Sequence, residues 1–361
     1  MEIFLIICVL ALITWYSVRI YLSHKKKKSR GVVRELLFSK DIFLTWLDNL
    51  IVSVTGLQRL IQDLSSSFYG SKQHIYTILI ALLSQWHALI QGAPWTWKTS
   101  LVRAFSQACD LSYWRIQCTP DLLPQDILWV ETYKQQEESF AYNKGPIFSH
   151  VVHVDEINRA TPKLQSAFLE AMQERQVTLS GKTYPLPDPF FLIATQNPYD
   201  AIWTFLLPYA QVDRFMMWVV VGDISTDETL QLVKDAKQVH TGSDKYDHIQ
   251  ACLSVADVLA MQQEIQSIHA PESVLQYCVA CVQYIKDAWF QMSIRATTSL
   301  VAAAKTIAYM QWKKETTIDD IALALLPVVK HRMAYIVWVQ LSDEKIYAIL
   351  TWSLQKDDIV G

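Results

Sequence analysis

Hydrophobic and polar positions divide the chain into three parts with different patterns. Nearly every position from 3 to 22 is apolar, and four lysines, Lys25 to Lys28, follow. Between residues 31 and 222, short apolar runs alternate with amphipathic stretches, which is typical of buried parallel strands connected by helices. From about residue 223 only helical periodicity continues. The pattern therefore predicts an apolar amino-terminal segment at 1–30, an α/β domain with lead-in helices at 31–222, and a helical domain at 223–361.

The amino-terminal segment has the length of a membrane-spanning helix. About twenty apolar residues are needed to cross the hydrocarbon core of a bilayer, and Ile3 to Leu22 supply them with few interruptions. A cleavable signal peptide would carry its positive charge before the apolar stretch, and a soluble helix with a basic flank is a further alternative. Because the lysines follow the stretch, we expect a single-pass anchor in the inner (cytoplasmic) membrane, with the remaining chain in the cytoplasm.

Two adjacent acids end one of the apolar runs in the α/β domain. The run Val151 to Val154 leads directly into Asp155 and Glu156, and in a parallel sheet such residues lie at the carboxyl edge, where ligands bind. Asp155 would hold a magnesium ion, and Glu156 would polarise a water molecule for attack on a γ-phosphate. The alternative is a strand followed by an acidic helix cap without catalytic function.

A candidate phosphate-binding loop precedes these acids by about sixty residues. The spacing from Gly92 to Lys98 and Thr99 is that of the motif G-x-x-x-x-G-K-[ST], in which lysine neutralises phosphates and the hydroxyl ligates magnesium. The indole of Trp97 replaces the second glycine and would fill space that a nucleotide needs. The residues expected to bind the nucleotide are Gly92, Ala93, Pro94, Trp95, Thr96, Trp97, Lys98 and Thr99.

Together with these motifs, several longer runs resemble the MoxR family of AAA+ ATPases over about residues 60–332. The runs are Arg115 to Pro124, Asp155-Glu156-Ile157-Asn158-Arg159-Ala160, Leu169 to Arg175, Ala194-Thr195-Gln196-Asn197-Pro198 and Asp213-Arg214-Phe215. The resemblance implies an α/β fold, with a three-layer αβα P-loop NTPase core around a parallel sheet and a carboxyl-terminal helical lid. It also implies ATP as substrate and Mg²⁺ as cofactor.

The resemblance assigns roles to three further polar residues. Asn197 is similar to the sensor-1 residue that aligns the attacking water, although a buried turn asparagine is the alternative. Arg214 is similar to the arginine finger that reaches a neighbouring subunit; alternatively it pairs with Asp213 or Glu174. Arg295 is similar to the sensor-2 arginine of the lid, although Ile294 stands where the family usually has proline. Whether Arg295 acts in its own subunit or in a neighbour is left open.

Two segments are predicted to form β-hairpins inserted into the α/β domain. One covers Val130 to Gly145, and the other covers residues 176–186 with Ser180-Gly181 in its turn. In the family such hairpins face the pore or the client protein. An ordinary surface hairpin is the alternative.

Glycine is scarce and tryptophan abundant. The chain contains 9 glycines and 13 tryptophans, whereas ordinary usage predicts about 25 glycines in a chain of this length. Tryptophan stands where the family usually has glycine at Trp86, Trp95, Trp97, Trp129, Trp203 and Trp312. One explanation is a phosphate loop that has decayed. The other is decoding, because UGA encodes glycine in some bacterial lineages and tryptophan in others. UGG codons at these positions would exclude decoding.

Charge and cysteine usage exclude other classes of function. The formal net charge is −3, and no basic stripe or DNA-binding motif suggests a nucleic-acid partner, which disfavours a DNA-dependent motor. Cys278 and Cys281 form a lone C-x-x-C without a second pair to complete a zinc site. We therefore expect core cysteines in a reducing compartment.

The expected function is that of a membrane-anchored, chaperone-like ATPase. The resemblance implies a homo-oligomeric ring, expected to be hexameric, that couples Mg-ATP hydrolysis to remodelling or activation of a protein client. It also implies a partner with a von Willebrand factor A domain. The competing hypothesis is a catalytically dead scaffold whose phosphate loop is blocked by Trp95 and Trp97.

Overall fold

The computed structural model describes residues 52–67, 72–92, 98–134, 139–179, 181–197, 204–205, 207–221, 249–287 and 291–337. The predicted membrane anchor at residues 3–22 lies outside these ranges. Within them, no helix combines the length and the apolar character that a membrane span requires.

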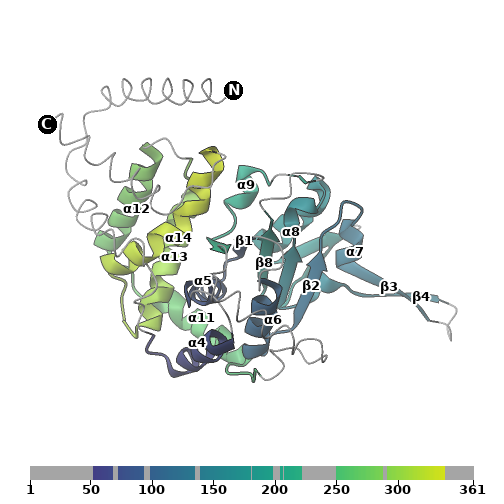
Figure 1. Ribbon diagram of the computed structural model, residues 1–361, viewed down its shortest axis with the longest axis horizontal. Coiled ribbons are helices and arrows are strands. Elements are labelled where there is room, and N and C mark those ends of the chain that lie inside the picture. The colour runs from purple at the N-terminus through teal and green to yellow at the C-terminus, as the bar shows by residue number, and fades with distance from the viewer. Residues whose placement is uncertain are drawn as a thin grey trace, which may run out of the picture.

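One parallel sheet forms the centre of the α/β domain (Figure 1). Within the described residues it contains five strands in the order β2-β5-β8-β1-β9, and each neighbouring pair is parallel. The strands are β1 (Ala88–Gly92), β2 (Tyr113–Gln117), β5 (Val151–Asp155), β8 (Phe191–Gln196) and β9 (Met217–Val221). All of them end at one edge of the sheet, the carboxyl edge, and begin at the opposite, amino edge.

Successive residues of the central strands face opposite sides of the sheet. Ile90 and Ile193 pack into one buried cluster, whereas their neighbours Leu89 and Leu192 pack into another. The first cluster is covered by α4 (Thr55–Ser67), α5 (Lys72–Leu83) and α6 (Lys98–Ala108), and the second by α7 (Pro124–Leu128) and α8 (Pro162–Glu174). Because both faces are buried, β5 and β8 are largely apolar runs, and the predicted three-layer core is confirmed.

Both predicted hairpins are present. Strands β3 (Trp129–Lys134) and β4 (Ser139–Lys144) pair antiparallel and project from the core on the side away from the lid helices (Figure 1). Strands β6 (Gln176–Leu179) and β7 (Lys182–Pro185) form the second hairpin. Lys182 pairs with Leu179, and Gly181 lies in the turn between the two strands, as predicted.

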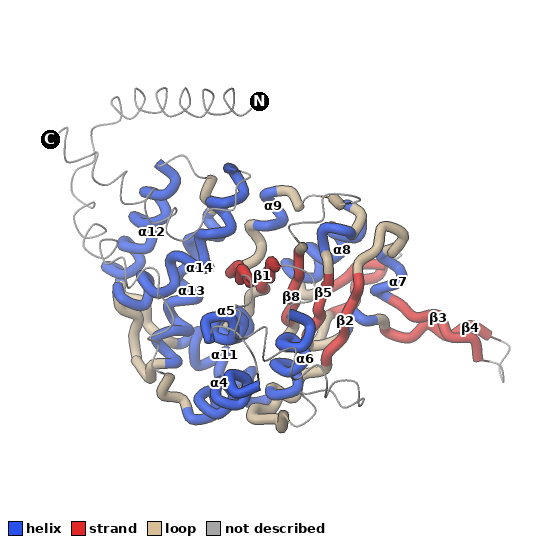
Figure 2. Tube along the Cα trace, viewed as in Figure 1, coloured by secondary structure: helices blue, strands red, loops and turns tan. Residues whose placement is uncertain are grey.

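The helical lid follows the sheet in the chain and lies beside it (Figure 2). Its described helices are α11 (Val255–Ser267), α12 (Glu272–Asp287), α13 (Ile294–Met310) and α14 (Ile318–Val337). They share the first core cluster with α5 and β9. The short helices η1 (Pro146–Phe148), η2 (Ile157–Arg159) and α9 (Tyr209–Val212) belong to the α/β domain.

Serine and threonine caps begin the lid helices as predicted. Ser254 and Asp257 form a reciprocal capping box at α11, and the Thr317 amide donates to Asp320 Oδ2 at 2.8 Å before α14. The third predicted box, at Ser225 and Glu228, lies outside the described residues.

The two cysteines of the C-x-x-C motif are buried in α12. Burial, together with the neighbouring Cys281, raises the pKa of Cys278 to about 12, and burial likewise raises the pKa of Cys281 to about 12. Protonated thiols are poor metal ligands. Their burial in protonated form agrees with the expected role as core residues.

The tryptophans at expected glycine positions differ in their surroundings. Trp95, Trp97 and Trp203 lie outside the described residues. Trp129 has an extended backbone, and its ring lies 5.8 Å from that of Phe148 and 5.0 Å from that of Tyr184. Trp312 adopts φ 61° and is 71% exposed, a backbone conformation that favours glycine.

Candidate functional site

The carboxyl edge brings together several residues that are far apart in the sequence. Gly92 ends β1, Asp155 ends β5, and Asn197 follows β8 directly, in strands that are neighbours in the sheet. Helix α6 begins at Lys98, so Thr99 lies in its first turn. Ala93, Pro94, Trp95, Thr96 and Trp97, and the side chain of Lys98, lie outside the described part of the structure.

Asp155 is a buried carboxylate held by charged and polar neighbours. The Thr195 hydroxyl donates to Oδ1, and Arg115 donates to Oδ2 from Nη2 at 2.6 Å and from Nε at 3.1 Å. Burial opposes ionisation, but the Thr195 hydroxyl, His153 and Arg115 together hold the pKa of Asp155 below its ordinary value. The group is therefore ionised at neutral pH, as a magnesium ligand must be.

The donor set at this edge fits magnesium. Mg²⁺ prefers hard oxygen ligands and is usually bound through one or two carboxylates together with substrate phosphates. An ionised Asp155 and the hydroxyl-bearing Thr99 offer such oxygens at one edge of the sheet.

Glu156 is fixed both by its backbone and by its carboxylate. Its backbone is left-handed, with φ 56°, and its amide donates to the Thr195 hydroxyl at 3.0 Å. Its Oε2 accepts from Gln117 Nε2 at 3.0 Å and lies 3.2 Å from Arg159 Nε. Left-handed backbone in a residue other than glycine is uncommon and clusters at functional sites. Thr195 thus links the two acids.

Asn197 is buried at the same edge, one residue past β8. Its backbone carbonyl accepts from Asn158 Nδ2 at 3.5 Å. This contact connects the end of β8 to the η2 turn that follows Glu156. The predicted site residues Glu156 and Asn197 therefore belong to segments that are hydrogen-bonded to each other.

Arg214 and Arg295 lie at the opposite, amino edge of the sheet. Both line a pocket of about 300 Å³ together with Gln85, Trp86 and His87, the residues that precede β1. Arg214 lies three residues before Met217, which pairs with Ala88 at the start of β1. Since a strand rises about 3.3 Å per residue, the five residues of β1 separate the two edges by roughly 13 Å. Within the chain, the structure therefore does not bring these arginines to Asp155 and Glu156.

The amino-edge pocket is electropositive. Burial and the nearby Arg295 lower the pKa of Arg214, while Asp213 and Glu174 oppose this effect. The Nε atom of Arg214 is buried without a hydrogen-bond partner, and Arg295 Nη1 lies 3.7 Å from Asp213 Oδ2. Arg175, a third arginine in this pocket, donates to the carbonyls of Gln85 and Phe190. Donors of Arg214 and Arg295 therefore remain for an anion.

Comparison with known proteins covers both domains. Residues 87–217 match the family described as "ATPase family associated with various cellular activities (AAA)", and residues 289–346 match the AAA lid domain. The chain is 32% identical over 316 residues to "Chaperone MoxR1" of Mycobacterium tuberculosis, covering 82% of this chain and 80% of that protein. This chain belongs to the MoxR family of AAA ATPases. AAA ATPases bind and hydrolyse ATP, typically with Mg²⁺.

Two further comparisons cover most of the chain. The chain is 34% identical over 280 residues to "Uncharacterized protein YeaC" of Bacillus subtilis, covering 77% of this chain and 86% of that protein. A crystal structure of a Cytophaga hutchinsonii protein proposed to be an ATPase superposes with a TM-score of 0.73 at 30% identity, covering 88% of this chain and 98% of that one. The family and the fold predicted from the sequence motifs are therefore confirmed.

Sequence reasoning missed several residues of the MoxR-like site. Arg115 and Gln117, which hold the two acids, belong to a family motif but had no predicted role. Their spacing of two along a strand puts both side chains on one face, and this signal could have identified them. Thr195, two residues before Asn197, carries the same signal. Arg332, which is fully buried in α14, has no comparable local signal.

Proposed function

We propose that this chain is a magnesium-dependent ATP hydrolase that works as a ring of identical subunits. The observation that carries the proposal is the placement of Asp155 and Glu156 at the same carboxyl edge as the end of β1, which leads to α6, with only β8 between the two strands. The phosphate-binding loop and the two acids then face one nucleotide.

Each residue at this edge has a distinct task in hydrolysis. Lys98 and the backbone N–H groups from Gly92 onward would bind the phosphates, and Thr99 with Asp155 would hold Mg²⁺, which neutralises developing charge when bound. Glu156 would polarise the attacking water, and Asn197 would orient it. Arg115 pairs with Asp155 and would help to hold that carboxylate in position.

The location of the arginines supports an oligomer. Arg214 and Arg295 share the amino-edge pocket and lie too far from Asp155 to contact phosphate in their own subunit. A guanidinium supplied by a neighbour stabilises charge on the transferred phosphoryl group. We therefore assign both arginines to the adjacent subunit's site, in a ring expected to be hexameric.

The ring would act on a protein client at the membrane. The relative from M. tuberculosis is named a chaperone, and the β3–β4 hairpin projects from the core where a client could meet it (Figure 1). A client with a von Willebrand factor A domain is the partner that the family suggests. Residues 3–22 would anchor the protein in the inner membrane with the ATPase in the cytoplasm, and no nucleic acid takes part.

Replacing Glu156 by glutamine tests the proposal. Glu156→Gln keeps the shape of the side chain but removes its basicity, so ATP binding should persist while kcat falls by about 100-fold or more. Steady-state phosphate release and binding of a fluorescent ATP analogue measure the two effects. Glu272→Gln, in the first turn of α12, is the matched control and should leave both unchanged. A Glu156→Gln protein with normal turnover would refute the assignment.

The dead scaffold is retained as a second candidate because Trp97 occupies a position where the phosphate loop normally needs glycine. ATP binding by the chain with its tryptophans in place distinguishes the two, with Trp97→Gly as the comparison. Tight binding with Trp97 in place excludes steric blockade. Binding that is detected only after Trp97→Gly would establish the scaffold for this chain.

A further inference from the structure

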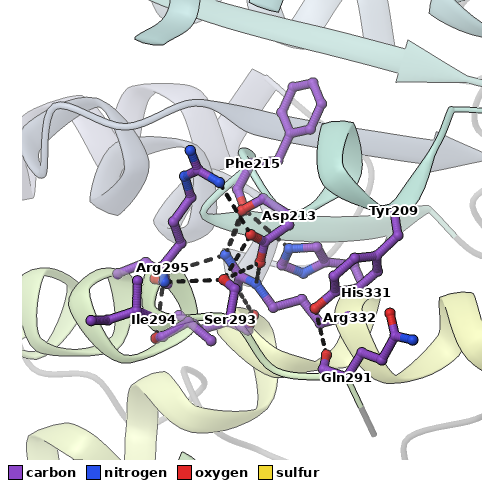
Figure 3. A network of polar contacts seen from close by, with 12 residues as sticks. Tyr209, Asp213, Phe215, Gln291, Ser293, Ile294, Arg295, His331 and Arg332 are labelled. Atoms are coloured by element: carbon purple, nitrogen blue, oxygen red, sulfur yellow. Dashed lines mark hydrogen bonds and ion pairs between the residues drawn. The ribbon is translucent and has the colours of Figure 1, made fainter.

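The core and the lid meet at a buried polar network centred on Asp213 (Figure 3). Asp213 is 2% exposed and immediately precedes Arg214. Ser293 comes from the start of α13, two residues before Arg295. The network therefore connects the short segments that carry the two amino-edge arginines.

The Asp213 carboxylate of the core accepts hydrogen bonds from two segments of the lid. Ser293 Oγ lies 2.8 Å from Oδ1 and 2.7 Å from Oδ2, and it also accepts from the amide of Arg295 at 3.0 Å. Arg332 Nε donates to Oδ1 at 2.8 Å. Ser293 thus caps α13 and fixes the first turn of that helix to the core through the same hydroxyl.

Arg332 and His331 hold the neighbouring backbone. Arg332 Nη2 donates to the carbonyls of Asp213 at 2.9 Å and Phe215 at 3.2 Å, and His331 Nε2 bonds the Phe215 carbonyl at 3.0 Å. Since Arg332 is fully buried and its donors are used inside the protein, it is not itself a phosphate ligand. Arg214, which stands between these two anchored residues, has little backbone freedom.

Two like charges side by side need a counter-charge to stay together. Arg214 and Arg295 line one pocket, and the Asp213 carboxylate lies 3.7 Å from Arg295 Nη1. We propose that Asp213 is a positioning residue that aligns Arg214 of the core with Arg295 of the lid, so that both guanidinium groups reach a neighbouring subunit's phosphates together. This inference rests on the proposed function, and its test can fail separately.

Ser293→Ala in the full-length chain is the most selective test. Asp213 itself is a poor target because its removal leaves Arg332 buried without a carboxylate partner. Ser254→Ala is the matched control, because Ser254 also caps a lid helix but bonds only Asp257. Both variants should lose a similar amount of stability, about 2–4 °C in Tm. Only Ser293→Ala should lower kcat, by about tenfold, because misplaced groups forfeit much of their catalytic effect.

ATP binding separates positioning from general damage. The nucleotide of each subunit lies at the other edge of the sheet, so the Kd for a fluorescent ATP analogue should stay within about twofold of wild type in Ser293→Ala. Ser293→Thr retains the hydroxyl and should restore kcat. Equal kcat in Ser293→Ala and Ser254→Ala would overturn the inference while the proposed function stands. Absence of hydrolysis by the wild-type chain would instead overturn the proposed function.

Mixed rings test whether the arginines act on a neighbour. A Glu156→Gln subunit keeps the arginine pair, and a Ser293→Ala subunit keeps the acid. Mixing equal amounts should raise phosphate release several-fold above the average of the two separate variants, because an intact arginine pair then faces an intact acid. If phosphate release by the mixture merely equalled this average, the arginine pair would not act on the neighbouring subunit.

Discussion

Trp312 lies two residues beyond the end of α13, in a backbone geometry that normally requires glycine. The Trp312 amide donates to the Tyr309 carbonyl at 2.8 Å and the Lys313 amide to the Ala308 carbonyl at 2.9 Å, the hydrogen-bond pattern of a helix that terminates in a left-handed residue. The exposed indole gains little packing that would offset this backbone strain. Trp129, in contrast, has an extended backbone, and its ring packs against Phe148 and Tyr184. Its backbone conformation therefore does not require glycine.

Trp312→Gly should therefore stabilise the protein. We expect the free energy of unfolding to rise by about 0.5–1 kcal/mol, because glycine adopts positive φ without steric cost. Denaturant unfolding followed by circular dichroism measures the change. Trp312→Ala is the control, since it removes the indole but retains a Cβ. If Trp312→Ala stabilised the protein equally, the effect would lie in the indole and not in the backbone.

Single residues at the carboxyl edge show how local strain serves the site. Glu156 adopts a left-handed backbone conformation, which is held by the hydrogen bond from its amide to the Thr195 hydroxyl. The same hydroxyl donates to the Asp155 carboxylate. The arrangement fixes the direction of the two carboxylates in advance of ligand binding. Such preorganisation is what electrostatic catalysis requires.

Among the elements, the two hairpins depend on glycine for different reasons. Gly145 closes the base of β3–β4, where an added Cβ would lie 2.6 Å from the Ile127 carbonyl oxygen and 2.7 Å from the Leu128 carbonyl carbon. Its amide also donates to the Leu128 carbonyl at 2.9 Å. Gly181 has φ +76° in the β6–β7 turn, with open space around it. Gly145 is therefore required because a side chain would collide with backbone atoms, and Gly181 is required because its backbone adopts positive φ.

Alanine at these two positions should separate the two effects. Gly145→Ala should lower the free energy of unfolding by about 2 kcal/mol or more, because rigid backbone must move. Gly181→Ala should cost only about 1 kcal/mol, the penalty of positive φ. Denaturant titration of both variants checks the order, and amide exchange should show faster opening of β3–β4 in Gly145→Ala alone. A larger loss for Gly181→Ala would contradict the close approach at Gly145.

At the scale of the whole molecule, two buried histidines connect distant layers. His87 Nδ1 accepts from the Leu192 amide and its Nε2 donates to the Met172 carbonyl, each at 3.0 Å. His331 connects the lid to Phe215 of the core. Burial, followed by the charge of Arg175 for His87 and of Arg332 for His331, lowers the pKa of each imidazole well below its ordinary value.

Acid should therefore destabilise the fold. A histidine whose pKa is depressed in the folded state contributes stability that is complete above its unfolded pKa, near 6.5, and is lost as the pH falls towards the folded pKa. Between pH 7.5 and 5.5 each imidazole should cost about 1.4 kcal/mol. Denaturant unfolding at several pH values measures the sum. His331→Gln, which can still donate to Phe215, should lose about half of this dependence; an unchanged slope would exclude His331 as a source.

The sequence alone determined the layered fold and the carboxyl edge. Apolar runs such as Val151 to Val154, and the alternation that buries Leu89 and Ile90 on opposite faces, are local properties that fix strands, and parallel strands must end at one edge. The order of residues along the chain therefore suffices to place Asp155, Glu156 and Asn197 together. The helix caps at Ser254 and Ser293 are also local signals.

Only the tertiary structure decided which arginines belong together and what holds them. Asp213 and Arg332 are 119 positions apart, and no periodicity links them. Their contact exists because the lid docks on the amino edge, and this docking depends on the summed packing of α13, α14 and β9. It places Arg214 and Arg295 in one pocket at the amino edge, away from Asp155 and Glu156. Long-range side-chain contacts of this kind follow from how elements pack, and local sequence does not encode that packing.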